Sequence, residues 1–422
     1  MRVRVGVTLL ALCGTMLQDP LVVQAQSVSM PSSESQAGSE PGTRLTPSIR
    51  IAERYDSNVF FVRGANLEDY VTTVSPNLKV EHKNQWVEGV VSGGATTEIF
   101  VNNPGLNYVG GTGRVDLNLD RAMSALVPGL GLRVSDSISY TPQPPAFAAP
   151  TGGNQISEAF VQGLQARRAN SFTNTGKVEA SYYFSEYMGL ISTYTDRRIR
   201  FGRPIATPSG GVTAGEFINT NFQTLTSGLV GTPSPADTIS LVYQYQKATF
   251  PDLGRGARGF STQGAMASWS RLITSTLQAT VEGGFNVISS SNHVNPIGAA
   301  SLQWNGQYTT VSISYSRAVS PSILSVATPL LSQAVTGTVT RHMTESLSLS
   351  LSGSYAVNRS VPDSSLIRFT SYLVTPSLEY KIGPVLTATL SYTHSEFQRN
   401  FSGVSTDFNR NMVMLALSAA WE

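Results

Sequence analysis

Thiols and charged side chains are scarce in this sequence. The single cysteine, Cys13, lies close to the N-terminus, so the rest of the chain has no thiol for a disulfide or a cysteine-bound metal. Charged residues make up 13% of the chain, about half their usual share in soluble globular proteins. The net charge of +2 leaves no basic excess to neutralise phosphates. The composition therefore excludes nucleic acid as a partner.

Motifs for catalysis or cofactor binding are also missing. The sequence contains no HExxH, GxSxG or phosphate-loop motif. The four histidines, His82, His293, His342 and His394, are widely separated, and none has metal-ligand spacing. We therefore predict no enzymatic activity, no cofactor and no metal site. A catalytic group assembled from residues far apart in the sequence is the alternative that remains open.

The N-terminal segment has the parts of a secretory signal. Arg2 and Arg4 precede an apolar stretch at 5–17, and Val23-Gln24-Ala25 supplies a small-residue cleavage site. The stretch is too short to span a bilayer as a helix. We expect a cleaved signal peptide at 1–25 and a disordered periplasmic spacer at 26–44, which is rich in Ser, Pro, Gly and Glu. From residue 45 to the end the sequence pattern is uniform and no second linker interrupts it, so 45–422 is predicted to be one domain.

Apolar and polar residues alternate over most of that domain, with no convincing helical period. Examples are RVDLNLD (114–120), TISLVYQYQ (238–246), SLSLSLSGSYAV (346–357) and VLTATLSY (385–392). Short connections, such as 83–85, 185–187, 235–237, 344–346 and 383–384, alternate with longer ones at 142–160, 203–217 and 398–409. The predicted fold class is all-β, a transmembrane antiparallel up-and-down β-barrel of about 18 strands.

The two strand faces favour a membrane barrel over a soluble sheet. One face carries Leu, Val, Ile, Tyr and Ala, whereas the other carries small polar and charged residues that would make a poor core. Aromatic residues occur near the predicted strand ends, as in membrane-interface girdles; they are Tyr55, Tyr70, Trp86, Tyr140, Tyr187, Tyr308, Tyr380, Tyr392 and Trp421. The last strand, with an aromatic next to the C-terminus, resembles a sorting signal for the bacterial outer membrane. Outer-membrane lipid, lipopolysaccharide and the barrel-assembly machinery are the expected partners.

With the apolar face turned to lipid, the other face lines the lumen. The predicted pore-lining residues are Arg50, Arg54, Lys79, Glu81, Glu88, Glu98, Arg114, Asp116, Arg133, Lys177, Glu179, Glu282, Ser348, Ser350, Ser352, Glu379 and Lys381. Their charges are of both signs, whereas strongly selective pores carry rings of one sign. The simpler interpretation is that many of these residues form ion pairs with their neighbours on a hydrated inner surface.

The densest group of cations lies in TDRRIRFGR (195–203). Arg197, Arg198, Arg200 and Arg203 surround Asp196 near the predicted outer rim. This outer-rim basic cluster either attracts phosphates of lipopolysaccharide or an anionic polymer, or is an ordinary charged rim. The sequence favours neither interpretation.

Two stretches near the start of the domain resemble a known family. They are IAERYDSNVFF (51–61) and DYVTTVSPNLKVE (69–81), and the matching positions are Tyr55, Asp56, Asn58, Ser75 and Pro76. This pattern resembles the outer-membrane barrels of beta-barrel porin family 2, which are encoded with exopolysaccharide or capsule loci, including exosortase-associated ones. The resemblance implies export of a polysaccharide substrate with the help of periplasmic polysaccharide-export proteins. Beyond the first strand pair it is architectural only.

Three functions are therefore compared. The first is an outer-membrane pore for polysaccharide, in which a lumen of hydroxyls and amides binds sugars weakly at many sites. The second is a general diffusion porin for small solutes, with 142–169 as its candidate constriction loop. The third is a structural or adhesive surface barrel without transport.

Overall fold

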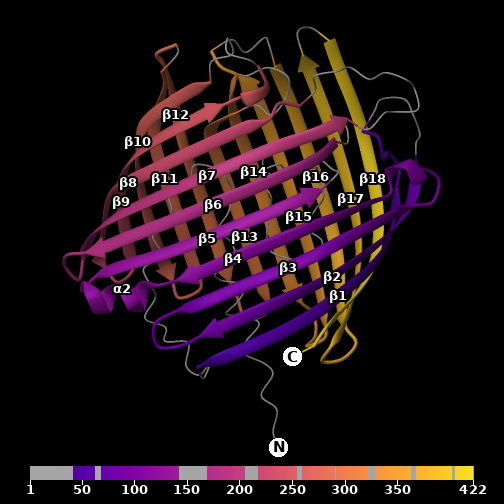
Figure 1. The fold of residues 1–422 in the computed structure, drawn as a ribbon, viewed down its shortest axis with the longest axis horizontal. Coiled ribbons are helices and arrows are strands. Elements are labelled where there is room, and N and C mark those ends of the chain that lie inside the picture. Colours follow the sequence, from indigo (N-terminus) through magenta and orange to yellow (C-terminus); the bar gives the residue numbers. More distant parts are fainter. Residues whose placement is uncertain are drawn as a thin grey trace, which may run out of the picture.

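The strands of this chain close into one barrel. The computed structural model describes residues 41–61, 68–141, 169–204, 217–253, 259–289, 291–321, 328–362, 367–401 and 404–421. These residues form a single 18-stranded sheet in which each strand pairs antiparallel with its neighbours in the sequence (Figure 1). The predicted fold class, an antiparallel up-and-down barrel, is confirmed.

The strands are long enough to cross a membrane at a tilt. They are β1 (Gly42–Asp56), β2 (Asp69–Lys83), β3 (Glu88–Phe100), β4 (Tyr108–Asn118), β5 (Leu130–Thr141), β6 (Ala169–Tyr183), β7 (Met188–Pro204), β8 (Thr220–Ser234), β9 (Asp237–Thr249), β10 (Phe260–Thr274), β11 (Leu277–Ile288), β12 (His293–Asn305), β13 (Thr309–Pro321), β14 (Pro329–His342), β15 (Leu347–Ser360), β16 (Ile367–Lys381), β17 (Leu386–Phe401) and β18 (Val404–Ala420). Short helices η1 (Pro104–Leu106), α2 (Asp120–Leu126) and η2 (Pro251–Leu253) lie in the connections. No helix in the described ranges is long and apolar enough to span a bilayer.

Pairing of the first strand with the last removes both sheet edges. Ile51 lies opposite Leu417, and Asp56 lies opposite Met412 in an unbroken antiparallel register. Because no edge remains, the backbone N–H and C=O groups of the wall pair within the sheet, as a lipid environment requires. We call the junction of β1 and β18 the seam.

Alternation places an apolar surface on the outside. On β9, Leu241 and Tyr243 are exposed, while the intervening Val242 and Gln244 are buried on the inner side. Most of the aromatic residues expected at strand ends are likewise exposed; these are Tyr70, Trp86, Tyr140, Tyr187, Tyr308, Tyr380, Tyr392 and Trp421. A wall that turns its large apolar residues outward is suited to lipid, not to water.

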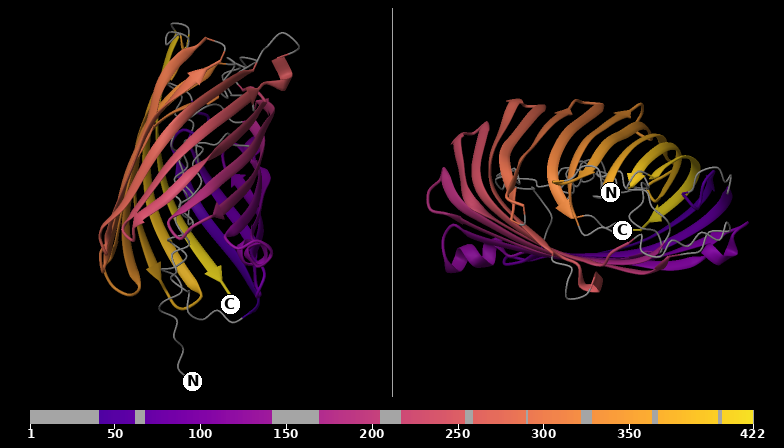
Figure 2. Two further views of the ribbon diagram at one scale, coloured as in Figure 1. Left: turned by 90° about the vertical axis from the view of Figure 1, so that its left-hand side faces the viewer. Right: turned by 90° about the horizontal axis from the view of Figure 1, so that it is seen from above.

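The two ends of the barrel differ in their connections. At one end the strands turn through 84–87, 184–187, 235–236, 275–276, 306–308, 343–346 and 382–385, together with α2. β1 begins and β18 ends at this same end. By the usual rule for such barrels, this is the periplasmic end. Seen from above, the barrel is flattened, with indigo-to-magenta strands on one broad side and orange-to-yellow strands on the other (Figure 2).

Some expected boundaries need correction. β1 starts at Gly42, so residues 42–44, assigned to the spacer, belong to the wall. The stretch 398–409, expected as a long loop, is mostly strand, since β17 reaches Phe401 and β18 resumes at Val404. The outward residues of this stretch are polar, because the stretch lies beyond the apolar band of the barrel. The alternation of apolar and polar residues is therefore hard to detect in the sequence there. The signal peptide at 1–25, spacer residues 26–40 and most of the candidate constriction loop, 142–168, lie outside the described residues.

Candidate functional site: the inner wall of the barrel

The predicted lumen charges of β1–β6 lie on the inner face, on one broad side of the barrel. Outward residues alternate with inward ones, so residues two positions apart lie on the same face. An acidic residue two positions from a basic one is therefore beside it on the inner wall. We call this side the charged wall; its members are Arg50, Arg54, Lys79, Glu81, Glu88, Glu98, Arg114, Asp116, Arg133, Lys177 and Glu179.

Most of these charges are paired with a neighbour. Lys79 Nζ lies 2.6 Å from Glu81 Oε1, and Lys177 Nζ lies 3.0 Å from Glu179 Oε1. Arg114 donates to Asp116 within the same strand. At the periplasmic end, Arg133 reaches Asp120 of α2 at 2.9 Å, and Lys83 reaches Glu88 at 3.0 Å. The charged wall is therefore polar, but its charges largely cancel locally.

The opposite side of the inner wall is nearly uncharged. We call the inner face of β9–β17 the hydroxyl wall, because its cross-strand contacts join Ser, Thr, Asn and Gln side chains. Ser350 Oγ lies 2.6 Å from Ser377 Oγ. The other pairs include Ser240–Ser268, Ser314–Thr336, Ser320–Ser332, Thr375–Thr393 and the Gln246–Thr262–Asn286 row. Ser348 and Ser352 lie on this same face of β15.

Few acidic or basic side chains interrupt the hydroxyl wall. Among its described Asp, Glu, Lys and Arg side chains, those on the inner face are Glu282, Glu379 and Lys381. Glu282 is buried on β11, while Glu379 and Lys381 lie near the periplasmic end of β16. One side of the lumen is thus charged and the other is nearly uncharged. The positions of the charged residues in the sequence did not by themselves reveal this division.

The family-like residues Asp56 and Asn58 lie at the seam. Asp56 is fully buried and accepts a bidentate hydrogen bond from Arg410 of β18, with Arg410 Nε 2.8 Å from Asp56 Oδ1. Asn58 N–H donates to Asp56 Oδ1 at 3.1 Å, and its side chain donates to Asn409 O at 3.2 Å. The guanidinium of Arg410 also lies 4.6 Å from the ring centre of Phe61. The motif therefore ties the first strand to the last.

The seam contacts continue along the inner face. Arg54 joins Asp56 to Glu98 of β3, at 3.9 and 3.2 Å. Asp69, opposite Asp56 in the register, is also fully buried and accepts from the side chain of Asn103 at 2.8 Å. Sequence reasoning missed Arg410 and Asp69. Arg410 could have been found from the alternation of the last strand. That alternation turns Arg410 inward, and the last strand of a closed barrel must pair with the first.

The other family-like positions have separate surroundings. Tyr55 faces outward, where its ring centre lies 5.4 Å from that of Tyr70. Ser75 faces inward and lies 3.1 Å from Thr96 through their hydroxyl oxygens. Pro76 lies on the outward face of β2, opposite Ile49 of β1. These positions support the wall and do not form one site.

The basic cluster of β7 does not act as one group. Alternation turns Arg197 inward, whereas Arg198 and Arg200 lie on the outer face of the wall. Arg203 lies within β7, but its side chain is outside the described ones. Arg197 therefore does not share a face with Arg198 and Arg200, because a strand separates consecutive side chains onto opposite faces.

The chemistry of the inner wall is hydrogen bonding and compensated charge. Within the described ranges, no three His, Cys, Asp or Glu side chains are grouped to hold a metal ion. The part-buried pairs Ser350–Ser377 and Ser314–Thr336 retain free lone pairs and can rotate their protons, so they can exchange partners with a polar solute, whereas Ser240–Ser268 and Thr375–Thr393 are buried.

Comparisons with known proteins agree with the barrel. Residues 292–420 match the family model described as "Putative beta-barrel porin 2", consistent with the family that the first two strands resemble. No curated protein matches.

Among solved structures, OpdQ of Pseudomonas aeruginosa is similar, at 9% identity, with 90% of this chain and 98% of that chain covered and a TM-score of 0.44. OccAB3 of Acinetobacter baumannii gives 13% identity, 90% and 99% coverage and a TM-score of 0.44. The siderophore receptor PirA of Pseudomonas aeruginosa is 9% identical, with 91% of this chain and 81% of that chain covered and a TM-score of 0.45. At these values the likenesses carry no conclusion about function.

Proposed function

We propose that this porin-like β-barrel of the bacterial outer membrane conducts polysaccharide outward across that membrane. The observation that carries the proposal is the hydroxyl wall, where pairs such as Ser350–Ser377 line a face with very little charge. The resemblance of the first strands to exopolysaccharide-locus barrels points the same way. Barrels of about 16–18 strands are wide enough to hold a water-filled channel.

The two sides of the lumen suit a long neutral or weakly charged polymer. Hydroxyls and amides offer hydrogen bonds of modest net strength, so a chain can exchange many contacts while it moves. The charges of the opposite side cancel in pairs such as Lys79–Glu81, which leaves little net field to hold a charged repeat unit. Periplasmic polysaccharide-export proteins are the expected partners at the short-turn end.

Deletion of the gene tests the proposal. Surface polysaccharide should be lost while its synthesis continues, so that polymer accumulates inside the cell envelope. Restoring the wild-type chain should restore export. Unchanged surface polysaccharide in the deletion strain would overturn the proposal.

A general diffusion porin is the second candidate, and the compensated charges of the charged wall favour it as well. Its test is conductance in planar bilayers combined with the deletion strain. A steady conductance without any polysaccharide phenotype would select the diffusion porin. Absence of both conductance and export defect would select a structural or adhesive surface barrel.

A further inference from the structure

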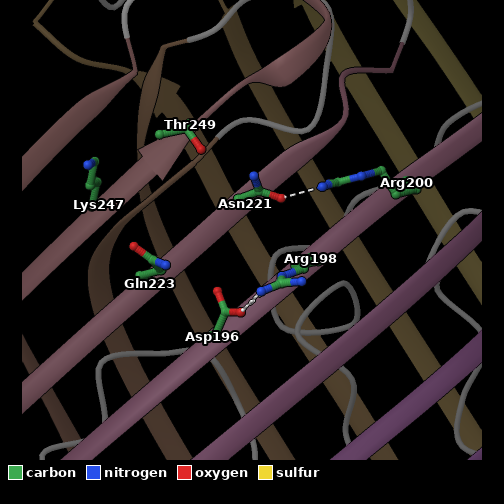
Figure 3. Close-up of a pocket in the computed structure, with 7 residues that line it drawn as sticks. All are labelled: Asp196, Arg198, Arg200, Asn221, Gln223, Lys247 and Thr249. Carbon is green, nitrogen blue, oxygen red and sulfur yellow. Dashed lines mark hydrogen bonds and ion pairs between the residues drawn. The ribbon is translucent and has the colours of Figure 1, made fainter.

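A polar depression of about 280 Å³ lies on the outside of the barrel, near the end with the long connections (Figure 3). We call it the outer-wall basic pocket. Its lining includes Asp196, Arg198 and Arg200 from β7, Asn221 and Gln223 from β8, and Lys247 from β9. Because the pocket faces away from the lumen, a solute inside the barrel does not reach it.

The register places the pocket directly above an apolar surface. Leu190, Leu229 and Leu241 form one cross-strand row on the outer face, and all three are exposed. Closer to the pocket, Tyr194, Leu225 and Tyr245 form another exposed row. The surface thus passes from leucine to tyrosine to charge over a few residues of each strand. This order follows the membrane from acyl chains through the interface to the headgroups.

The cations of the pocket are held in place by their neighbours. Arg198 donates to one oxygen of Asp196, from Nε at 3.0 Å and from Nη2 at 2.8 Å, while its side chain stays 58% exposed. Arg200 donates to Ile199 O at 2.9 Å, to Thr220 O at 3.2 Å and to Asn221 Oδ1 at 2.6 Å. Figure 3 shows Arg198 beside Asp196 and Arg200 beside Asn221, with Lys247 across the depression.

The pocket keeps unused donors. An arginine has five N–H donors, so Arg198 retains donors away from Asp196. Lys247 is exposed, and among the described residues it makes no hydrogen bond or ion pair. The lining residues carry three cations against the one carboxylate of Asp196. Asp136 lies further along the same outer face and accepts from Asn174 at 3.0 Å.

We propose that the outer-wall basic pocket binds a phosphate group of the phosphorylated lipid in the outer leaflet, the lipid A part of lipopolysaccharide. Arg198 and Lys247 contact the phosphate, and Arg200 with Asn221 fixes the shape of the pocket. The acyl chains of the same lipid lie along the tyrosine and leucine rows below. Positioned guanidinium and ammonium groups are the usual ligands of phosphate.

Binding of purified lipid A to the folded full-length chain in detergent tests this proposal. Native mass spectrometry should detect bound bisphosphorylated lipid A, and dephosphorylated lipid A should bind much more weakly. The variant Arg198→Gln/Lys247→Gln should bind the bisphosphorylated lipid about tenfold or more weakly, since two charge-assisted contacts are lost.

A matched control has the same change of charge at the periplasmic end. Arg271→Gln/Arg341→Gln removes two exposed cations from the outer face there and should bind as the wild type does. Heat-modifiable migration on gels checks that each variant folds.

Three results would overturn the proposal. One is equal binding by Arg198→Gln/Lys247→Gln and by wild type. Another is an equal loss in the periplasmic-end control. The third is competition by inorganic phosphate at the concentration of the lipid, which would assign the pocket to free phosphate.

Discussion

At the scale of single residues, the seam shows how a family-like motif acquires a physical role. Asp56 is buried without access to water, so its charge is stable only if another charge and several donors surround it. Arg410 supplies the charge from the other end of the chain, and Asn58 supplies a backbone donor. The motif therefore contributes to closing the barrel and not to binding a solute.

Arg410→Met should destabilise the folded barrel by about 3–5 kcal/mol, the usual cost of removing one partner of a buried pair. The carboxylate of Asp56 then stays buried beside the more distant Arg54, 3.9 Å away. Urea unfolding of the refolded protein in detergent measures this free energy. An unfolding midpoint equal to that of wild type would contradict the role of the seam.

Two further variants serve as controls for the seam. Asp56→Asn/Arg410→Met should be less destabilised than the sum of its single variants, because both charges of the pair are gone. Arg341→Met, at an exposed position of β14, should change stability by no more than about 0.5 kcal/mol.

At the scale of elements, β15 shows what alternation decides. Leu349, Leu351 and Tyr355 are exposed on the lipid side, while Ser350 and Ser354 face inward. Leu349 lies close to the start of β15, at the periplasmic turn, so Leu351 lies nearer the centre of the membrane-crossing part. Depth, and not only the face, therefore sets the cost of a charge on this strand.

Leu351→Arg should cost about 2–4 kcal/mol of folding stability, as for a cation near the middle of the bilayer. Leu349→Arg should cost less, towards the roughly 0–1 kcal/mol that is typical near an interface. Unfolding in lipid vesicles measures both values. Equal costs at the two positions would show that the placement of β15 in the membrane is wrong.

Ser350→Arg should fold, because position 350 faces the lumen, and should lower single-channel conductance by adding bulk and charge to the hydroxyl wall. Planar-bilayer recordings measure the effect, with Leu349→Arg as the neighbouring control that points away from the lumen. A folded Ser350→Arg protein with the conductance of wild type would place the conducting path elsewhere.

At the scale of the whole molecule, the lumen has two unlike sides. The charged wall pairs its charges along each strand, whereas the hydroxyl wall has few charges to pair. Because opposite charges lie within a few ångströms of each other, their fields cancel over the width of a channel. The intact barrel should therefore discriminate little between cations and anions.

The reversal potential in a potassium chloride gradient checks this expectation. Wild type should give a value near zero. Lys79→Gln/Lys177→Gln removes two cations that face Glu81 and Glu179 in the lumen, so the potential should shift clearly toward that of a cation-selective channel. Arg271→Gln/Arg341→Gln makes the same charge change on the outside and should leave the potential unchanged. A strong selectivity in wild type would contradict the cancellation of charges.

The sequence alone determined the class of fold, the approximate number of strands and the face that each residue occupies. It did so because a strand has a period of two, so alternation fixes inside and outside for every position once one face must meet lipid. The inward facing of Lys79 and Ser350 and the outward facing of Leu349 follow from this rule. It also implies the splitting of Arg197 from Arg198, since neighbours in a strand never share a face.

The tertiary structure decided what depends on residues far apart in the chain. Arg410 meets Asp56 only because the barrel closes with a particular register between its first and last strands. The outer-wall basic pocket needs β7, β8 and β9 side by side before Arg198 and Lys247 border one depression. The strands that extend through 398–409 were hidden because outward positions such as Gln398 and Asn409 are polar, so the apolar outer face that marks the other strands is missing. The alternation along each strand determines which face a side chain occupies. The register between strands and the closure of the barrel determine which of those side chains come into contact.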